Sequence, residues 1–138
     1  EFAMERLHRS FTDRLVSYVY EDVCRDAVWG LSAQGKVPFF IQKVGRWWNV
    51  RNDEIDVVGL SEEDGGILFG ECKFLARPVG ADVLTALEEK SRLVSWGSSD
   101  RREMFVLFSI SGFSDKLRDI ANRRDDVLLI EEVGQLTR

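Results

Sequence analysis

The sequence of 138 residues predicts an α/β fold in which helices flank a mixed β-sheet. Apolar residues recur at spacings of three and four near the start, the middle and the end of the chain, which is the period of amphipathic helices. Three short segments with strand-like composition lie between the first two of these helices, separated by turn-forming Asp, Asn and Gly residues. A continuous apolar segment, residues 104–110, is typical of a strand that is buried on both faces.

The first half of the predicted fold is one helix followed by three strands. The helix is expected over about residues 10–31, and the strands over residues 39–50, 55–60 and 67–74. A short polar turn, residues 61–66, joins the second and third strands. These two strands are therefore expected to pair antiparallel.

The second half of the predicted fold alternates helices and strands. A helix follows Pro78 and ends at Trp96-Gly97, and the apolar strand comes next. Ser114 can cap a further helix, and residues 127–130 form a last short strand. A helix between the third and fourth strands implies a crossover connection, so that helices cover both faces of the sheet. The predicted order is αβββαβ plus a C-terminal helix and strand.

Composition limits the classes of protein that the chain can belong to. Hydrophobic residues make up 44% and charged residues 31%, an ordinary globular balance. No apolar run approaches the roughly 20 residues of a membrane helix, so no membrane association is expected. Residues 1–4 look like a cloning remnant before a start-like Met4, and residues 5–138 are expected to form a single domain of the usual size.

The reactive residue types are few. Cys24 and Cys72 stand in apolar contexts, which is typical of buried thiols in a reducing cytoplasm. A single histidine, His8, leaves almost no material for zinc chemistry or a histidine triad. The formal net charge of −5 counts against a high-affinity DNA clamp, although it leaves room for a local basic face.

Three polar residues interrupt strands that otherwise need burial. Asp56 lies in the second predicted strand, and Glu71 and Lys73 lie in the third. Alternate side chains of a strand share a face, so Glu71 and Lys73 should point the same way. Asp56 is flanked by Ile55 and Val57, which need burial, so it should face away from their packing. Pairing of the two strands can bring Asp56 opposite Glu71, 15 residues later (71 − 56).

Two facing carboxylates beside a lysine are chemically suited to hold a divalent cation. The carboxylates repel each other unless a cation joins them, and oxygen ligands favour Mg²⁺, or Mn²⁺ in its place. A lysine on the same face could orient or deprotonate a metal-associated water, which suits phosphodiester hydrolysis. A simple cross-strand ion pair is the structural alternative for Glu71 and Lys73. The preceding Gly70 and the carboxylate of Asp56 favour the metal site.

Two segments carry a family resemblance: Glu54-Ile55-Asp56-Val57-Val58-Gly59 and Leu68-Phe69-Gly70-Glu71-Cys72-Lys73. They resemble the PD-(D/E)XK nuclease superfamily, especially its archaeal Holliday-junction-resolvase-like branch. The resemblance implies a restriction-endonuclease-like αβββαβ core, metal binding by Asp56 and Glu71, and a catalytic role for Lys73. In resolvase-like members a helical Glu after an aromatic residue often completes the site, and Tyr20-Glu21 matches that pattern. Ile55 stands where the superfamily's name has Pro.

A longer resemblance runs from about Tyr20 to Ile130, carried by residues 21–25, 45–48, 79–84 and 108–113 together with the Glu-Cys-Lys strand. These segments look like the C-terminal domain of unknown function of archaeal P-loop ATPases. The resemblance implies an N-terminal ATPase domain in the natural protein, although a stand-alone protein is equally open. The sequence has no G-x-x-x-x-G-K-[ST] loop, so this chain should not itself bind ATP.

Together these features predict a Mg²⁺-dependent DNA endonuclease-like domain, a metal-dependent deoxyribonuclease acting on DNA that includes branched or structured forms. The alternative is a non-catalytic DNA- or protein-binding domain that regulates an attached ATPase, which the acidic charge favours. A homodimer is also open, because resolvase-like folds tend to pair.

Four further residues are candidates for contacts with nucleic acid. Trp48 could stack on an unpaired base while Arg46 and Arg51 bind phosphates. The adjacent Trp47 and Trp48 should point to opposite faces, and packing is the more frequent role of such residues. Lys90, on the helix after the site, could contact a substrate phosphate, although most lysines on helix surfaces are solvated.

Overall fold

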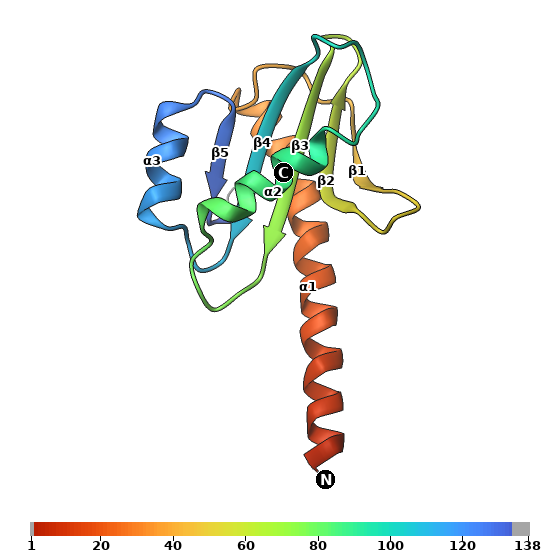
Figure 1. Ribbon diagram of the computed structural model, residues 1–138, viewed down its shortest axis with the longest axis vertical. Helices are drawn as coiled ribbons and strands as arrows, with labels where there is room; N and C mark the ends of the chain where they lie inside the picture. The colour runs from red at the N-terminus through yellow and green to blue at the C-terminus, as the bar shows by residue number, and fades with distance from the viewer. Residues whose placement is uncertain (1, 134–138) are drawn as a thin grey trace.

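The computed structural model describes the backbone of residues 2–133 and the side chains of residues 15–133. A five-stranded sheet lies between helices on its two faces, as Figure 1 shows. The elements follow one another as α1 (Phe2–Ala33), β1 (Lys43–Trp48), β2 (Glu54–Ser61), β3 (Gly66–Lys73), α2 (Ala81–Ser91), β4 (Arg102–Ser109), α3 (Asp115–Arg123) and β5 (Val127–Ile130). The predicted αβββαβ order with a C-terminal helix and strand is confirmed.

The sheet is mixed, as predicted, and its strands stand side by side in chain order. β1, β2 and β3 pair antiparallel, whereas β3 with β4 and β4 with β5 pair parallel. The parallel strands at the centre are buried on both faces, which explains the continuous apolar sequence of β4. The ends of β2 and β3 that lie next to each other carry the polar residues singled out in the sequence.

Each face of the sheet packs against a different helix layer. On one face, the α1 residues Cys24, Val28 and Leu31 pack against strand residues such as Val57 and Leu68. On the other face, the apolar stripe of α2 packs against alternate strand residues, among them Ile67, Phe69 and Leu107. α1 therefore crosses behind the same strand ends that α2 approaches from the front (Figure 1).

Several element boundaries differ from the prediction, and α2 ends at Ser91, before the predicted end at Trp96-Gly97. α1 begins at Phe2 and not near residue 10, because the preceding residues include good helix formers but no apolar stripe that would reveal a helix. β1 spans only Lys43–Trp48 of the predicted residues 39–50. Phe39 and Ile41 are buried in the α1-side core, so their apolar character reflects packing of an irregular segment and not strand pairing.

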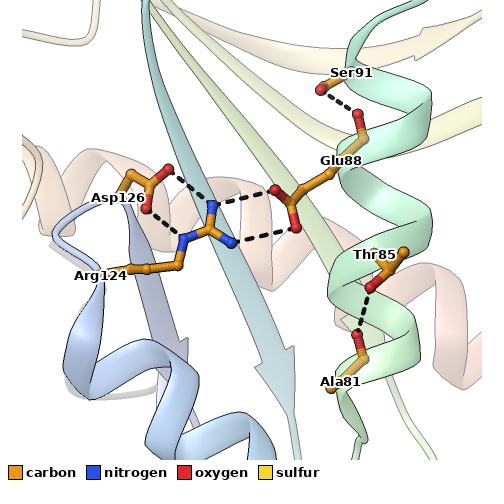
Figure 2. Close-up of polar contacts among 6 residues, drawn as sticks. All are labelled: Ala81, Thr85, Glu88, Ser91, Arg124 and Asp126. Atoms are coloured by element: carbon orange, nitrogen blue, oxygen red, sulfur yellow. Dashed lines mark hydrogen bonds and ion pairs between the residues drawn. The ribbon is translucent and has the colours of Figure 1, made fainter.

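An ion-pair network fixes α2 to the C-terminal part of the chain (Figure 2). The Arg124 guanidinium, just after α3, bonds the Glu88 carboxylate at 3.2 Å and the Asp126 carboxylate at 2.9 Å. All three side chains are partly shielded from water, and each arginine contact is charge-assisted. The network holds α2, the helix that carries Lys90, in a fixed position over the sheet.

Within residues 2–133, the structure contains no helix that is both long enough and apolar enough to cross a membrane. The longest helix, α1, carries charged residues between Glu5 and Asp26.

Candidate active site

A cavity of about 330 Å³ opens where α1 passes the neighbouring ends of β2 and β3. Glu21 from α1, Asp56 from β2, and Glu71 and Lys73 from β3 all line it. The four residues are far apart in the sequence, yet the fold brings them to one place. Arg46 from β1 also lines the cavity, so it contains both signs of charge.

Strand β3 supplies two of the four residues from one face. Cys72 packs against the α1-side core, and the ring of Phe74 lies 5.4 Å from the ring of Tyr20 on α1. Strand alternation turns Glu71 and Lys73 to the opposite face, where Glu71 meets Lys90 of α2. The shared direction of Glu71 and Lys73 is the one that the alternation predicts.

Asp56 sits in a β-bulge. Between Gly45 and Trp47 of β1, the paired residues of β2 run from Val58 to Ile55, so β2 holds one extra residue. The prediction that Ile55 and Val57 share one packing face is therefore wrong. Ile55 is buried in the α2-side core and Val57 in the α1-side core, because the bulge breaks the alternation at Asp56.

The bulge aims the Asp56 carboxylate at the next strand. The β2–β3 ladder ends at the pair of Val57 with Gly70. One residue beyond this pair, a side chain replaces the backbone as the acceptor: Asp56 Oδ2 accepts a hydrogen bond of 3.0 Å from the backbone N–H of Cys72. This contact sets the carboxylate beside Glu71, at the position across the hairpin that the residue spacing predicts.

Glu71 is a buried carboxylate in an unfavourable setting. Only 9% of the residue is exposed, and its Oε1 lies 3.5 Å from Lys90 Nζ. Its Oε2 is buried and has no hydrogen-bond partner among the described residues. Burial, followed by the charge of Asp56, raises the pKa of Glu71 to about 7, even though Lys90 and Lys73 act in the opposite direction.

Glu21 is a second carboxyl whose charge is disfavoured. Burial is the main cause, followed by the charge of Asp56 and hydrogen bonding with it, and together they raise the pKa of Glu21 to about 7. The positive charges of Arg25 and Arg46 lower it in part. Asp56 interacts with both Glu21 and Glu71, so three carboxyl groups share one region.

Residues 1–90 match the model of the family DUF234, described as archaeal and bacterial proteins of unknown function. The matched part is most of the chain and contains Glu21, Asp56, Glu71 and Lys73. The chain belongs to this family.

Two individual proteins are similar to parts of this DUF234 chain. An uncharacterized protein of Methanocaldococcus jannaschii is 34% identical over 73 residues, which are 53% of this chain and 16% of the relative. The chain therefore spans only a small part of the length of that relative. The crystal structure of a repair endonuclease from Pyrococcus abyssi superimposes with a TM-score of 0.44 and 12% identity, covering 66% of this chain and 39% of the other.

The carboxylates of the DUF234 chain suit a hard divalent cation. No three His, Cys, Asp or Glu side chains within residues 15–133 form a group that could hold a metal ion by themselves. Mg²⁺, however, usually keeps several waters and binds through one or two carboxylates together with substrate phosphate. Asp56 and Glu71 provide such a pair, and a cation would supply a partner for Glu71 Oε2, which has none among the described side chains.

Arg25 is a site residue that the sequence analysis missed. Its Nη1 donates a hydrogen bond of 2.8 Å to the backbone carbonyl of Asp56, and its Nη2 pairs with Asp22. Arg25 lies one helical turn after Glu21, so α1 presents the carboxylate and the guanidinium to the bulge together. The four-residue spacing from Glu21 was the available signal, but a partner 31 residues away is not visible in the sequence.

Replacing Arg25 by Ala is expected to loosen the bulge and to move the Asp56 carboxylate away from Cys72. The hydrogen-bonded Cys72 amide should then shift upfield in a ¹H–¹⁵N spectrum, while Arg25→Lys keeps part of the downfield shift. The expected loss of unfolding free energy is about 1–2 kcal/mol, since a charge-assisted hydrogen bond is lost. An unchanged Cys72 amide in Arg25→Ala would contradict the assigned positioning role.

Of the candidates for contacts with nucleic acid on and near β1, Arg46 lines the cavity and Trp48 and Arg51 do not. Arg46 pairs with Glu54 at 3.0 Å and lies over the ring of Trp48 at 5.4 Å. Trp48 is 65% exposed and lies outside the cavity, whereas Trp47 is half-buried against the α2-side core, so the two point to opposite faces as predicted. Arg51 is exposed in the β1–β2 loop and does not line the cavity.

Lys90 makes contacts with two groups of the protein. Its Nζ donates to the backbone carbonyl of Glu54 at 3.0 Å and approaches Glu71 Oε1 at 3.5 Å. Lys90 does not line the cavity, and its contacts place it beside Glu71; its predicted contact with a substrate phosphate stays a prediction.

Proposed function

We propose that this chain is a DNA endonuclease-like domain that hydrolyses phosphodiesters with Mg²⁺ or Mn²⁺. One observation carries the proposal: the buried Glu71 carboxylate faces Asp56, and one of its oxygens has no hydrogen-bond partner among residues 15–133, in a cavity that Lys73 also lines. A fold gains nothing from packing two carboxylates together, so the arrangement is best explained by a ligand that neutralises them.

Each residue of the cavity has a role in this proposal. Asp56 and Glu71 would hold the cation, which would polarise the scissile phosphate and the attacking water when bound. Lys73 shares the face of Glu71 and donates a hydrogen bond that orients the water for attack on phosphorus. Glu21, whose pKa is raised to about 7, is partly ionised near neutral pH, and its ionised form can accept the proton that the attacking water loses.

The natural context is part of the same proposal. The matched segment is 16% of the length of the Methanocaldococcus jannaschii relative, so a relative of this domain is one part of a much longer chain. We place an ATPase domain N-terminal to the nuclease-like domain, as the resemblance to archaeal P-loop ATPases implies. DNA that is branched or otherwise structured is the proposed substrate.

The experiment that tests the proposal compares Lys73→Ala with Lys116→Ala, an exposed lysine on α3. Wild type should cleave linear, nicked or branched DNA with Mg²⁺ or Mn²⁺ and should be inactive in EDTA. Lys73→Ala should lower the cleavage rate by about a hundredfold or more, because a positioned proton-transfer group is removed. Lys116→Ala should cleave like wild type. Intact DNA under all conditions, or equal rates for both variants, would refute the proposal.

The second candidate function is a non-catalytic DNA- or protein-binding domain that regulates an attached ATPase. The net charge of −5 and the absence of a three-ligand acidic group within residues 15–133 favour it. Under this alternative, Glu71→Gln changes partner binding or ATPase control while no metal-dependent cleavage exists to be lost.

A further inference from the structure

The β1–β2 hairpin projects from the sheet next to the candidate active site. In Figure 1 its tip extends sideways beyond the body of the domain. The tip, residues 49–53, joins two strands that carry Arg46 and Glu54, both of which line the active-site cavity. The hairpin tip would therefore contact a long substrate that reaches Asp56 and Glu71.

The tip is held in one shape by its own hydrogen bonds. Asn49 Oδ1 accepts from the backbone N–H groups of Arg51 and Asp53, both at 3.0 Å, and Asn49 Nδ2 donates to Asp53 Oδ2 at 3.1 Å. Asn52 has a positive φ of 66°, which the bond from its N–H to the Asn49 carbonyl supports. A loop that its own hydrogen bonds already hold in one conformation loses little conformational entropy when it binds a partner.

Large apolar groups are exposed on and below this stapled tip. Val50 is 100% exposed and Trp48 is 65% exposed, although neither exposure helps the domain to fold. The guanidinium of Arg46 lies over the Trp48 ring at 5.4 Å and fixes its orientation. A rigid, exposed indole beside positive charge is the arrangement on which a nucleobase stacks.

A second cavity lies under the tip and touches the first. It measures about 390 Å³ and is lined by Arg46, Trp48, Asn49, Asn52 and Glu54. Arg46 and Glu54 also line the active-site cavity, so the two hollows are neighbours along the same strands. A ligand can therefore occupy both, with a charged part at the carboxylates and a flat part at the tryptophan.

We propose that the second cavity is a subsite for one unpaired nucleotide of a DNA strand whose phosphodiester enters the candidate active site. The proposal rests on the proposed function. The base stacks on Trp48, the amide of Asn52 bonds the base edge, and Arg51 at the tip faces a flanking phosphate. A base inside a duplex is already stacked and paired, so it does not enter. The substrate class is therefore DNA with unpaired bases: single strands, flaps or branches.

The test measures binding in EDTA, so that cleavage plays no part. Three fluorescein-labelled probes of matched sequence are used at low salt: a single strand, a flapped duplex and a blunt duplex. Trp48→Ala should weaken binding of the single strand and the flap by about tenfold, the effect of losing one stacked base. Trp48→Phe should recover part of the affinity. Phe40→Ala, which removes another exposed aromatic of 64% exposure, should bind like wild type.

Different results would overturn the nucleotide subsite and the nuclease activity. Equal affinities for wild type and Trp48→Ala, an equal loss on the blunt duplex, or no binding of any probe overturns the subsite. If the hairpin binds a protein instead of DNA, wild type and Trp48→Ala have equal affinities for the DNA probes. Binding through Trp48 without any cleavage in Mg²⁺ or Mn²⁺ supports the subsite and overturns the nuclease. Cleavage in Mg²⁺ or Mn²⁺, together with equal DNA affinities of wild type and Trp48→Ala, supports the nuclease and overturns the subsite.

Discussion

Replacing Asp56 by Ala is expected to lower the rate of metal-dependent DNA cleavage by about a thousandfold or more. Asp56 interacts with both Glu21 and Glu71, and after burial its charge is the next cause that raises their pKa values. Loss of one of two cation-holding groups removes several kcal/mol of transition-state stabilisation, and each 1.4 kcal/mol is about tenfold in rate. No other described carboxylate reaches the Cys72 N–H, so no neighbour replaces it.

The measurement compares initial rates of cleavage for wild type, Asp56→Ala and Asp26→Ala. Asp26 is an exposed aspartate on α1 that does not line the cavity. Its replacement by Ala removes the same charge from the chain as Asp56→Ala does. Asp26→Ala should cleave at the wild-type rate. Circular dichroism should show that both variants are folded. A rate for Asp56→Ala above about a tenth of wild type would contradict the role given to Asp56.

Replacing Glu71 by Gln is expected to make the metal-free protein more stable at pH 8, by up to about 3 kcal/mol. The pKa of Glu71 rises from its ordinary value of 4.5 to about 7 on folding, and this difference corresponds to about 3 kcal/mol. The side chain is 12% exposed, so solvent screens the effect only slightly. Gln keeps the shape of the side chain and carries no charge.

The sign of the pH dependence follows from proton binding. Between pH 4.5 and about 7 the folded protein holds a proton on Glu71 that the unfolded chain has lost. Wild type therefore loses stability as the pH rises through this window, and the loss is complete above pH 7. The advantage of Glu71→Gln should be absent below pH 4.5, should grow up to pH 7, and should then stay constant.

Thermal unfolding in EDTA from pH 4 to pH 8 tests this expectation. Glu89→Gln, a change at an exposed glutamate on α2, is the control and should follow wild type at each pH. Adding Mg²⁺ at pH 8 should raise the stability of wild type but not that of Glu71→Gln, since only the charged carboxylate binds the ion. If Glu71→Gln were less stable than wild type at pH 8, the carboxylate would be stabilising and the account of its setting would be wrong.

The order and type of the elements could be predicted from the sequence because two periods of apolar residues alternate clearly along it. The continuous apolar run of β4 indicated a strand buried on both faces, and the helix between β3 and β4 indicated a parallel pair. The start of α1 could not be predicted, because the residues that precede its core-facing stripe follow no apolar pattern. The irregular segment around Phe39 and Ile41 resembles a strand in composition alone.

The location of the candidate site could also be predicted, since polar residues in buried strands stand out. Glu71 and Lys73 share a face by alternation, and the separation from Asp56 suited a hairpin. The bulge at Asp56 was not predictable, because it arises from the competing burial of Ile55 and Val57 on opposite faces. The contact of Arg25 with the Asp56 carbonyl depends on how α1 crosses the sheet, which no local pattern encodes.

We propose that Asp56 and Glu71 together bind one divalent cation. Calorimetric titration of Mn²⁺ and of Mg²⁺ into wild type and Asp56→Ala at pH 8 tests for this site, because Glu71, whose pKa is raised to about 7, has then lost its proton in wild type. We expect one binding event in wild type and in Asp26→Ala, and none in Asp56→Ala. Absence of binding to wild type, or equal binding to wild type and Asp56→Ala, would contradict it.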